Sequence, residues 1–294
     1  MHLMGIGDEA GGALDFQIKA ARELGWKFIE MRGVEVPGFP KGNFHDIPEK
    51  AFEIACERLR ENGLGVYCFG STIMNWAKTV ETPFEVTLEE VKRAIPRMKR
   101  AGTKFVRIMS LKPTETDSVT PPLVFERVRE VTKRFCDAGL QPVHENCMNY
   151  GGMSSAHALE LLEKCPGLKW VFDTANPVFN HDRMLPAPWP RQNAWEFWSA
   201  VRDQVAHIHV KDATWSPAKN DADYNWPGEG QGQVRRILKD ALSRGYDAGI
   251  SIEPHMVVVF HDAHARAVGD EEVCKNFVEY GRRLEKLIAE VRAR

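Results

Sequence analysis

The segment DAGLQPVHEN (137–146) joins the two features that decide the fold of this chain. Its first part closes a stretch with helical periodicity at Gly139, and a glycine just past a helix adopts the left-handed conformation that ends it. Its second part is an apolar run that ends on Glu145, as expected of a short buried strand. A helix, a turn of about two to five residues and a strand are therefore predicted in direct succession, which is the arrangement of α/β units.

The same pattern recurs along the whole chain. Glycine closes four further helix-like stretches, at Gly25, Gly63, Gly102 and Gly245. We expect strands within residues 2–7, 27–34, 65–71, 104–110, 140–146, 168–173, 205–212 and 249–255. We expect helices within residues 13–25, 49–63, 87–102, 122–138, 155–164, 193–203, 231–244 and 270–293. Strict alternation of the two predicts a parallel sheet.

The connections differ at the two ends of the predicted strands. Turns before the strands are short, whereas three connections after them are long, at 174–192, 213–229 and 256–268. This asymmetry is typical of a (β/α)₈ barrel with its active site on the long-loop face. We therefore predict an α/β fold, a single TIM-barrel domain over residues 1–294, with the active site at the C-terminal face of the strands. The alternative, an open doubly wound sheet, lacks support because GIGDEAGG (5–12) is not the G-x-G-x-x-G phosphate-binding pattern.

Composition excludes several classes of function. The net charge is −2, which gives no electrostatic footprint for nucleic acid or an anionic membrane surface. No apolar run approaches the roughly 18 residues that span a bilayer. The six cysteines show no C-x-x-C spacing, and the N-terminus has no basic segment of a signal peptide. We therefore expect a cytoplasmic protein with reduced thiols.

Residues able to bind a metal stand at the ends of four consecutive predicted strands. The strands read LQPVHEN (140–146), LKWVFD (168–173), VAHIHVKD (205–212) and GISIEPH (249–255), and the residues are Glu145, Asp173, His209 and Glu253. Side chains alternate across a strand, and one consistent choice of inner face includes all four of them. Neighbouring strands lie about 4.8 Å apart, so the four strand ends can share one ion.

Each of these residues alone has an ordinary explanation. A strand-end acid is commonly a helix cap or loop anchor, and a strand histidine is commonly a core residue. Together they would place three carboxylates in a mostly enclosed cavity, which is heavily penalised unless a cation compensates them. Oxygen ligands with one imidazole suit a hard divalent ion, so we expect one Mn²⁺, with Mg²⁺ or Co²⁺ as alternatives.

Five motifs in order resemble a known family. They are HEN (144–146), FDTAN (172–176), HVKD (209–212), PGEGQG (227–232) and IEPH (252–255). This combination resembles the xylose isomerase-like (β/α)₈ superfamily of sugar isomerases, epimerases and inosose dehydratases, over essentially the whole chain. The resemblance to ketose 3-epimerases implies that the four residues named above hold one Mn²⁺ or similar ion. It also implies that Glu145 and Glu253 act as acid and base.

The chemistry expected of such a site is enolisation of a ketone. A divalent ion bound by a ketone oxygen and a neighbouring hydroxyl acidifies the adjacent C–H and stabilises the enediolate. The leading hypothesis is a divalent-metal-dependent sugar isomerase or epimerase that acts through a metal-bound enediolate on a keto-sugar or sugar acid. The alternative is a lyase on an oxidised sugar: a dehydratase, a 3-oxo-glycoside eliminating enzyme or a decarboxylase. A lyase needs a further positioned acid, for which His255, on the face of Glu253, is the candidate.

Two positions depart from the ketose 3-epimerase pattern. Asn176 stands where those enzymes often carry His, and Trp215 stands where they carry Arg. Both family residues contact substrate, so sugar recognition through Asn176 and Trp215 is expected to differ. The departure strengthens the lyase alternative.

Four further residues are candidates for substrate binding. Glu30 and Arg32 share a face at the end of the second strand and either bind sugar hydroxyls or form an ion pair. Lys211 either neutralises an enediolate or forms an ion pair within the barrel. Glu229 either reaches the cavity from its loop or is solvated.

The expected partner is a small carbohydrate. Trp189, Trp215 and Trp226 lie on long loops and are candidates for a lid, a sugar-stacking surface or a homo-oligomer contact. A metal-dependent DNA-repair phosphodiesterase would need more histidines and a basic surface. A non-catalytic sugar-binding barrel would not need two carboxylates beside a metal.

Overall fold

A sheet of eight parallel strands forms the centre of the protein in this computed structural model, which describes residues 1–257 and 268–293. The order of the strands around the sheet is β1-β12-β9-β8-β7-β6-β5-β2. Their bounds are β1 His2–Gly5, β2 Phe28–Met31, β5 Gly65–Phe69, β6 Phe105–Ile108, β7 Gln141–Glu145, β8 Lys169–Asp173, β9 Val205–Val210 and β12 Gly249–Ile252. A single parallel bridge between Ile6 and Glu30 joins β1 to β2, so the sheet is a nearly closed barrel. The predicted TIM-barrel fold is confirmed.

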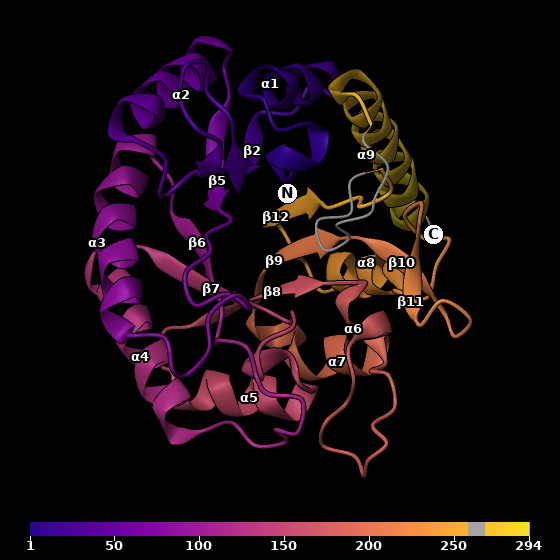
Figure 1. Ribbon diagram of the computed structural model, residues 1–294. Coiled ribbons are helices and arrows are strands. Elements are labelled where there is room, and N and C mark those ends of the chain that lie inside the picture. The colour runs from indigo at the N-terminus through magenta and orange to yellow at the C-terminus, as the bar shows by residue number, and fades with distance from the viewer. Residues whose placement is uncertain (258–267, 294) are drawn as a thin grey trace.

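Helices surround this barrel on the outside (Figure 1). They are α1 Leu14–Glu23, α2 Glu49–Glu61, α3 Phe84–Ala101, α4 Pro122–Asp137, α5 Ser155–Lys164, α6 Asn176–Phe179, α7 Ala194–Val201, α8 Val234–Ser243 and α9 Asp270–Arg292. Three short 3₁₀ helices, η1 Gly7–Ala10, η2 Tyr150–Gly152 and η3 Arg202–Gln204, lie in the connections. Seven of the eight expected helical segments contain one of the longer helices, and α3 begins three residues before the expected segment 87–102.

Two small hairpins extend from the mouth of the barrel and were not expected. In the first, β3 Gly33–Val34 pairs antiparallel with β4 Gly42–Asn43. In the second, β10 Asp212–Ser216 pairs antiparallel with β11 Asp221–Asn225, at the right edge of Figure 1. The expected strand segments 27–34 and 205–212 are therefore each divided between a barrel strand and a hairpin strand.

The five glycines that predicted helix ends have the backbone conformation that this role requires. Their φ angles lie between 67° and 80°, at Gly25, Gly63, Gly102, Gly139 and Gly245. After α3, the N–H of Gly102 bonds to the carbonyl of Lys99 in this left-handed turn. Short glycine turns therefore lead into the amino ends of the strands, and the opposite ends carry the longer loops.

Apolar packing leaves the polar residues at one end of the barrel interior. Between strands and helices, the rings of Trp170, Phe172 and Trp198 are all buried. Inside the barrel, Val143 and Val171 belong to a small buried apolar cluster. Each lies two residues before Glu145 or Asp173 on the same strand face. The apolar layer thus lies beneath the acidic strand ends.

No helix within the described ranges is long and apolar enough to cross a bilayer. All six cysteines are free thiols, as the sequence predicted.

Asp212, two residues after β9, anchors the long loop that follows β11. Its buried carboxylate accepts backbone hydrogen bonds of 2.8–3.0 Å from Ala213, Gly228, Gly230 and Gly232. A Cβ atom at Gly232 would lie 2.8 Å from Asp212 Oδ1, and one at Gly230 would lie 2.5 Å from it. The glycines of PGEGQG (227–232) are therefore required for the close approach of this backbone to one carboxylate.

We predict that Asp212→Asn lowers the free energy of unfolding by about 2 kcal/mol, because the new amide group would face buried N–H donors. Urea denaturation of the full chain measures this loss. The matched control is Asp221→Asn, an exposed aspartate on β11, which should change stability by no more than about 0.5 kcal/mol. Equal stability of the two variants would show that Asp212 does not anchor the loop.

Candidate metal centre

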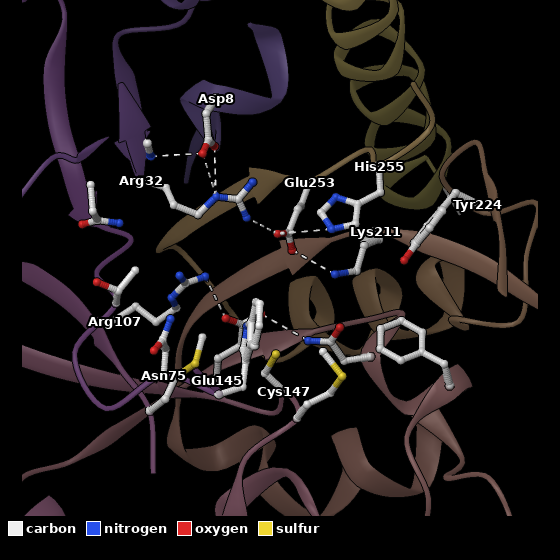
Figure 2. Close-up of a pocket in the computed structure, with 18 residues that line it drawn as sticks. Asp8, Arg32, Asn75, Arg107, Glu145, Cys147, Lys211, Tyr224, Glu253 and His255 are labelled. Carbon is white, nitrogen blue, oxygen red and sulfur yellow. Dashed lines mark hydrogen bonds and ion pairs between the residues drawn. The ribbon is translucent and has the colours of Figure 1, made fainter. Parts of the chain in front are cut away.

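A cavity of about 310 Å³ opens at the carboxyl ends of the barrel strands. Figure 2 shows charged side chains from distant parts of the chain converging on it. Six residues proposed from the sequence line this cavity: Arg32, Glu145, Asn176, Lys211, Glu253 and His255. It lies on the long-loop face, where the barrel fold places active sites.

The four expected metal ligands come together beside this cavity: Glu145 and Glu253 line it, whereas Asp173 and His209 lie outside its described lining. Glu145, Asp173, His209 and Glu253 each offer one ligand atom, and these atoms lie within 4.8 Å of one another. The strand register explains the convergence, because Asp173 and Ser251 both pair with His209 on adjacent strands. Glu253 lies two residues beyond Ser251 on the same face, and Glu145 ends β7. All four side chains are buried.

Two atoms of this group are suited to bind a cation because they lack hydrogen bonds to the described residues. Asp173 Oδ2 and His209 Nδ1 are buried and have no hydrogen-bond partner within the described part of the chain. Lys211 Nζ lies 3.2 Å from Asp173 Oδ2 as an ion pair, and His209 Nδ1 is 3.6 Å from Glu145 Oε1. Buried polar atoms without hydrogen bonds are costly, and a bound metal would satisfy both. The residues present therefore fit a divalent ion.

Glu30 fixes the orientation of His209. The Glu30 oxygens lie 3.0 and 3.2 Å from His209 Nε2, and Glu30 Oε2 also contacts His207 Nε2 at 2.9 Å and Ser251 Oγ at 2.7 Å. With Nε2 donating to a carboxylate, Nδ1 remains as the acceptor that faces the ligand group. Glu30 was expected either to bind sugar hydroxyls or to form an ion pair; it is fully buried, pairs with His207 and His209, and lies outside the described lining of the cavity. Glu30 therefore contacts the side of the His209 ring that faces away from the other three expected ligands.

Cations pair with the carboxylates but do not balance them. Arg107 Nη1 bonds to Glu145 at 2.9 Å, and Arg32 Nη1 bonds to Glu253 at 2.5 Å. Lys211 Nζ lies 3.0 Å from Glu253 Oε2. With histidines neutral, the connected network contains three cations (Arg32, Arg107, Lys211) and five carboxylates (Asp8, Glu9, Glu145, Asp173, Glu253). Carboxylates thus outnumber the arginine and lysine side chains of this network, to which His209 and Glu30 are adjacent.

Burial and neighbouring charges shift the pKa values of the expected ligand residues. Burial raises the pKa of Asp173 to about 7, and the charges of Glu253 and Glu145 add to the rise against the opposing effect of Lys211. At Glu145, Arg107 and His209 outweigh burial and lower the pKa to about 2. At His209, Glu30 and Glu145 outweigh burial and raise the pKa to about 10. A metal ion would therefore compete with protons at Asp173 and His209.

Asn176 and His255 also reach the cavity. Asn176 Nδ2 donates to Glu145 Oε1 at 3.2 Å, and its backbone N–H donates to Asp173 Oδ1 at 2.7 Å. His255 Nδ1 lies 2.9 Å from Glu9 Oε1, and its Nε2 lies 3.9 Å from Glu253 Oε1. Asn176 thus positions two ligand carboxylates, while His255 adds a titratable group at the cavity wall.

Two substrate-binding candidates on loops are placed elsewhere. The Trp215 ring lies under the guanidinium of Arg191, at 3.6 Å, and Glu229 lies 3.4 Å from Arg283. Neither belongs to the described lining of the cavity, because the hairpin β10–β11 and the loop held by Asp212 carry them away. Trp189 and Trp226 are also covered by arginines, Arg183 and Arg283. A homo-oligomer contact through these tryptophans stays a prediction.

Several residues of the site were missed from the sequence. Arg107 interrupts the apolar strand β6, and an inward-facing arginine in such a run was a usable signal. Asp8 accepts two bonds from Arg32 Nε, at 2.9 and 3.1 Å, and Glu9 accepts one from Arg32 Nη2 at 2.7 Å. Both acids lie in η1, the short helix that follows β1 at the carboxyl end of the strand.

Fold and site together define a TIM barrel with an acidic, histidine-containing centre at its strand ends. A family model described as a xylose isomerase-like TIM barrel matches residues 18–289. The chain therefore belongs to the xylose isomerase-like TIM-barrel family.

Named relatives include different reaction types. The chain is 23% identical over 178 residues to a fructoselysine 3-epimerase from Shigella flexneri, a match that covers 57% of this chain and 58% of that protein. Its fold is similar to the probable 3-DHS dehydratase AsbF from Bacillus anthracis, with a TM-score of 0.67, 15% identity, and coverage of 95% and 98% of the two chains. It is also similar to a xylose isomerase-like protein from Mycobacterium smegmatis in complex with magnesium, with a TM-score of 0.63, 17% identity, and coverage of 98% and 97%.

We predict that Glu30→Gln weakens Mn²⁺ binding by about 10- to 100-fold, because loss of an outer carboxylate commonly has this effect on a ligating histidine. Isothermal titration calorimetry of the metal-free protein measures the dissociation constant. Glu229→Gln, which alters an exposed acid paired with Arg283, is the matched control and should bind as the wild type does. Unchanged affinity in the Glu30 variant would mean that this carboxylate does not orient His209.

Proposed function

We propose that this protein is a divalent-metal-dependent sugar isomerase or epimerase acting on a keto-sugar or sugar acid. One observation carries the proposal. The carboxylates of Glu145 and Glu253 stand on the two outer strands of the ligand group, with Asp173 and His209 between them, and both line the cavity. A carbon atom held there has a carboxylate on either side, which is the arrangement that proton transfer between two faces requires.

The ligand set favours a hard ion, with Mn²⁺ first and Mg²⁺ or Co²⁺ as alternatives. Glu145, Asp173, His209 and Glu253 would hold it. When bound, the ion polarises a ketone oxygen and stabilises negative charge on it, which acidifies the adjacent C–H bond.

The residues of the chain would supply the proton transfers. Glu145 and Glu253 are both ion-paired and ionised, so either can accept the proton of the carbon next to the ketone. Lys211 Nζ lies 3.0 Å from Glu253 Oε2, and the surrounding carboxylates outweigh burial and raise the pKa of Lys211, so it would stay protonated and stabilise negative charge there. The proton returned to carbon would come from solvent through the other carboxylate, while the first carboxylate keeps the proton that it accepted. Return of a proton to the opposite face gives an epimer, and its return to the neighbouring carbon gives an isomer.

A lyase is the second candidate, and the pair His255–Glu9 favours it. His255 lines the cavity beside Glu253, with Glu9 Oε1 2.9 Å from its Nδ1. Its φ of 52° is uncommon for a residue with a side chain, and its N–H donates to Glu9 Oε2 at 3.1 Å. A histidine held in this way can protonate a leaving group beyond the carbon being enolised. The dehydratase among the similar structures supports this candidate, whereas the fructoselysine 3-epimerase supports the first.

Incubation of the Mn²⁺-loaded protein with free ketoses and 3-oxo-glycosides in D₂O tests the proposal. We predict that deuterium is incorporated at the carbon next to the ketone. The product should be a stereoisomer or isomer of unchanged composition. NMR measures both results. Glu253→Gln should slow this exchange by about 100-fold or more, because a positioned acid–base group contributes at least this much. Glu229→Gln should exchange at the wild-type rate.

The products separate the two candidates. Loss of water, an aglycone or CO₂ after exchange would favour the lyase. If His255→Asn greatly slows this elimination but not the deuterium exchange, His255 is the acid that protonates the leaving group. Full exchange by the Glu253 variant, with its fold verified by circular dichroism, would remove Glu253 from the proton-transfer role.

A further inference from the structure

A second cavity, of about 240 Å³, adjoins the candidate active site. Cys147, Met148 and Phe179 line both cavities, so these residues form a shared wall between them. The Met148 side chain is 41% exposed, although it is large and apolar. A ligand held over the metal centre could therefore extend past this thioether into the second cavity.

The charges of the two cavities differ. The first is lined by three carboxylates (Asp8, Glu145, Glu253) and three cations (Arg32, Arg107, Lys211), whereas the described lining of the second includes Lys112, His181 and Arg183 and no acidic residue. Asn149 and Asn180 add uncharged polar side chains. The second cavity is therefore suited to a negatively charged group.

Arg183 is held in place by backbone carbonyls, and no carboxylate of residues 1–257 or 268–293 forms an ion pair with it. Its Nη1 donates to the backbone carbonyls of Thr114 and Asp117, both at 2.7 Å, and its guanidinium lies 4.7 Å from the centre of the Trp189 ring. The nearby Asp117 carboxylate accepts instead from Tyr150 Oη at 2.6 Å and from the Thr114 N–H at 2.8 Å. Burial lowers the pKa of Arg183, as expected for a cation that is only partly compensated.

Asn180 gives a second, independent indication of a ligand. It lines the same cavity and is only 9% exposed, yet its Nδ2 donates no hydrogen bond within the described ranges. A buried amide donor normally has a partner. An oxygen-rich group beside Arg183 would supply one.

We propose that the second cavity binds the anionic end, a carboxylate or phosphate group, of an extended substrate whose ketone end occupies the metal centre. The position of the ketone end rests on the proposed function, but the anion site does not. Charge-assisted bonds from Arg183 would hold the anion, with Lys112 and Asn180 contributing further donors. The site would thus select sugars that carry a negatively charged substituent over simple ketoses.

Binding of inorganic phosphate to the metal-free protein tests the anion site by itself. We expect saturable binding in the wild type, measured by calorimetry, and about tenfold weaker binding in Arg183→Met and in Asn180→Leu. Arg183→Lys keeps the charge and should retain part of the affinity, which separates loss of charge from damage to the loop. Arg129→Met removes an exposed arginine that bonds to the Lys164 carbonyl, and it should not alter binding. Absence of saturable binding, or equal binding in all variants, would overturn the proposal.

A matched pair of probes tests whether the two cavities hold one ligand. Both are fructose joined at C1 through nitrogen to a six-carbon chain, which ends in a carboxylate in one probe and in a methyl group in the other. We expect the Mn²⁺-loaded wild type to bind the carboxylate probe about tenfold more tightly, and Arg183→Met to lose this preference.

Equal affinities of the wild type for the two probes, together with phosphate binding, would overturn the extended-substrate proposal and leave a separate anion site. The failure of the proposed function has a different signature. Without a metal centre, Mn²⁺ would not bind, while phosphate binding would persist.

Discussion

The burial of several carboxylates at one end of the barrel is the constraint on which the rest of the site depends. Glu145, Asp173 and Glu253 are each brought there by the carboxyl end of a parallel strand, where their mutual repulsion is strong and water is largely absent. Buried charges of this kind persist only when they are paired. The chain supplies Arg32, Arg107 and Lys211 for this purpose, but the ion-paired network still carries an excess of negative charge.

The surrounding structure can be understood as support for that centre. Glu30, on β2, crosses the barrel interior to hold His209, on β9, so that one ring nitrogen faces the carboxylates. Asp212 follows the same strand and anchors a glycine-rich loop outside the cavity, which fixes the end of β9. The ligand geometry thus depends on contacts between segments far apart in the chain, and this coupling is what a closed barrel provides.

Local patterns predicted the barrel and the convergence of Glu145, Asp173, His209 and Glu253, because the glycine turns and the two-residue alternation of strands are local properties. The partners of Glu30 were not predicted because His207 and His209 are about 180 positions away and become neighbours only across the barrel. Trp215 lies on strand β10 of an unexpected hairpin, and Glu229 lies on the loop that Asp212 anchors. Arg107 was missed from the sequence, and its partner Glu145 lies on the neighbouring strand β7, 38 positions away.

The central claim is that the excess negative charge at the strand ends is a binding site for one divalent ion. A crystal structure of the protein grown with Mn²⁺, with anomalous difference maps, tests it most directly. The account predicts a single strong peak within bonding distance of Glu145, Asp173, His209 and Glu253, with Lys211 Nζ displaced from its present position 3.2 Å from Asp173. A map without a peak there, and with Lys211 still between Asp173 and Glu253, would contradict the account.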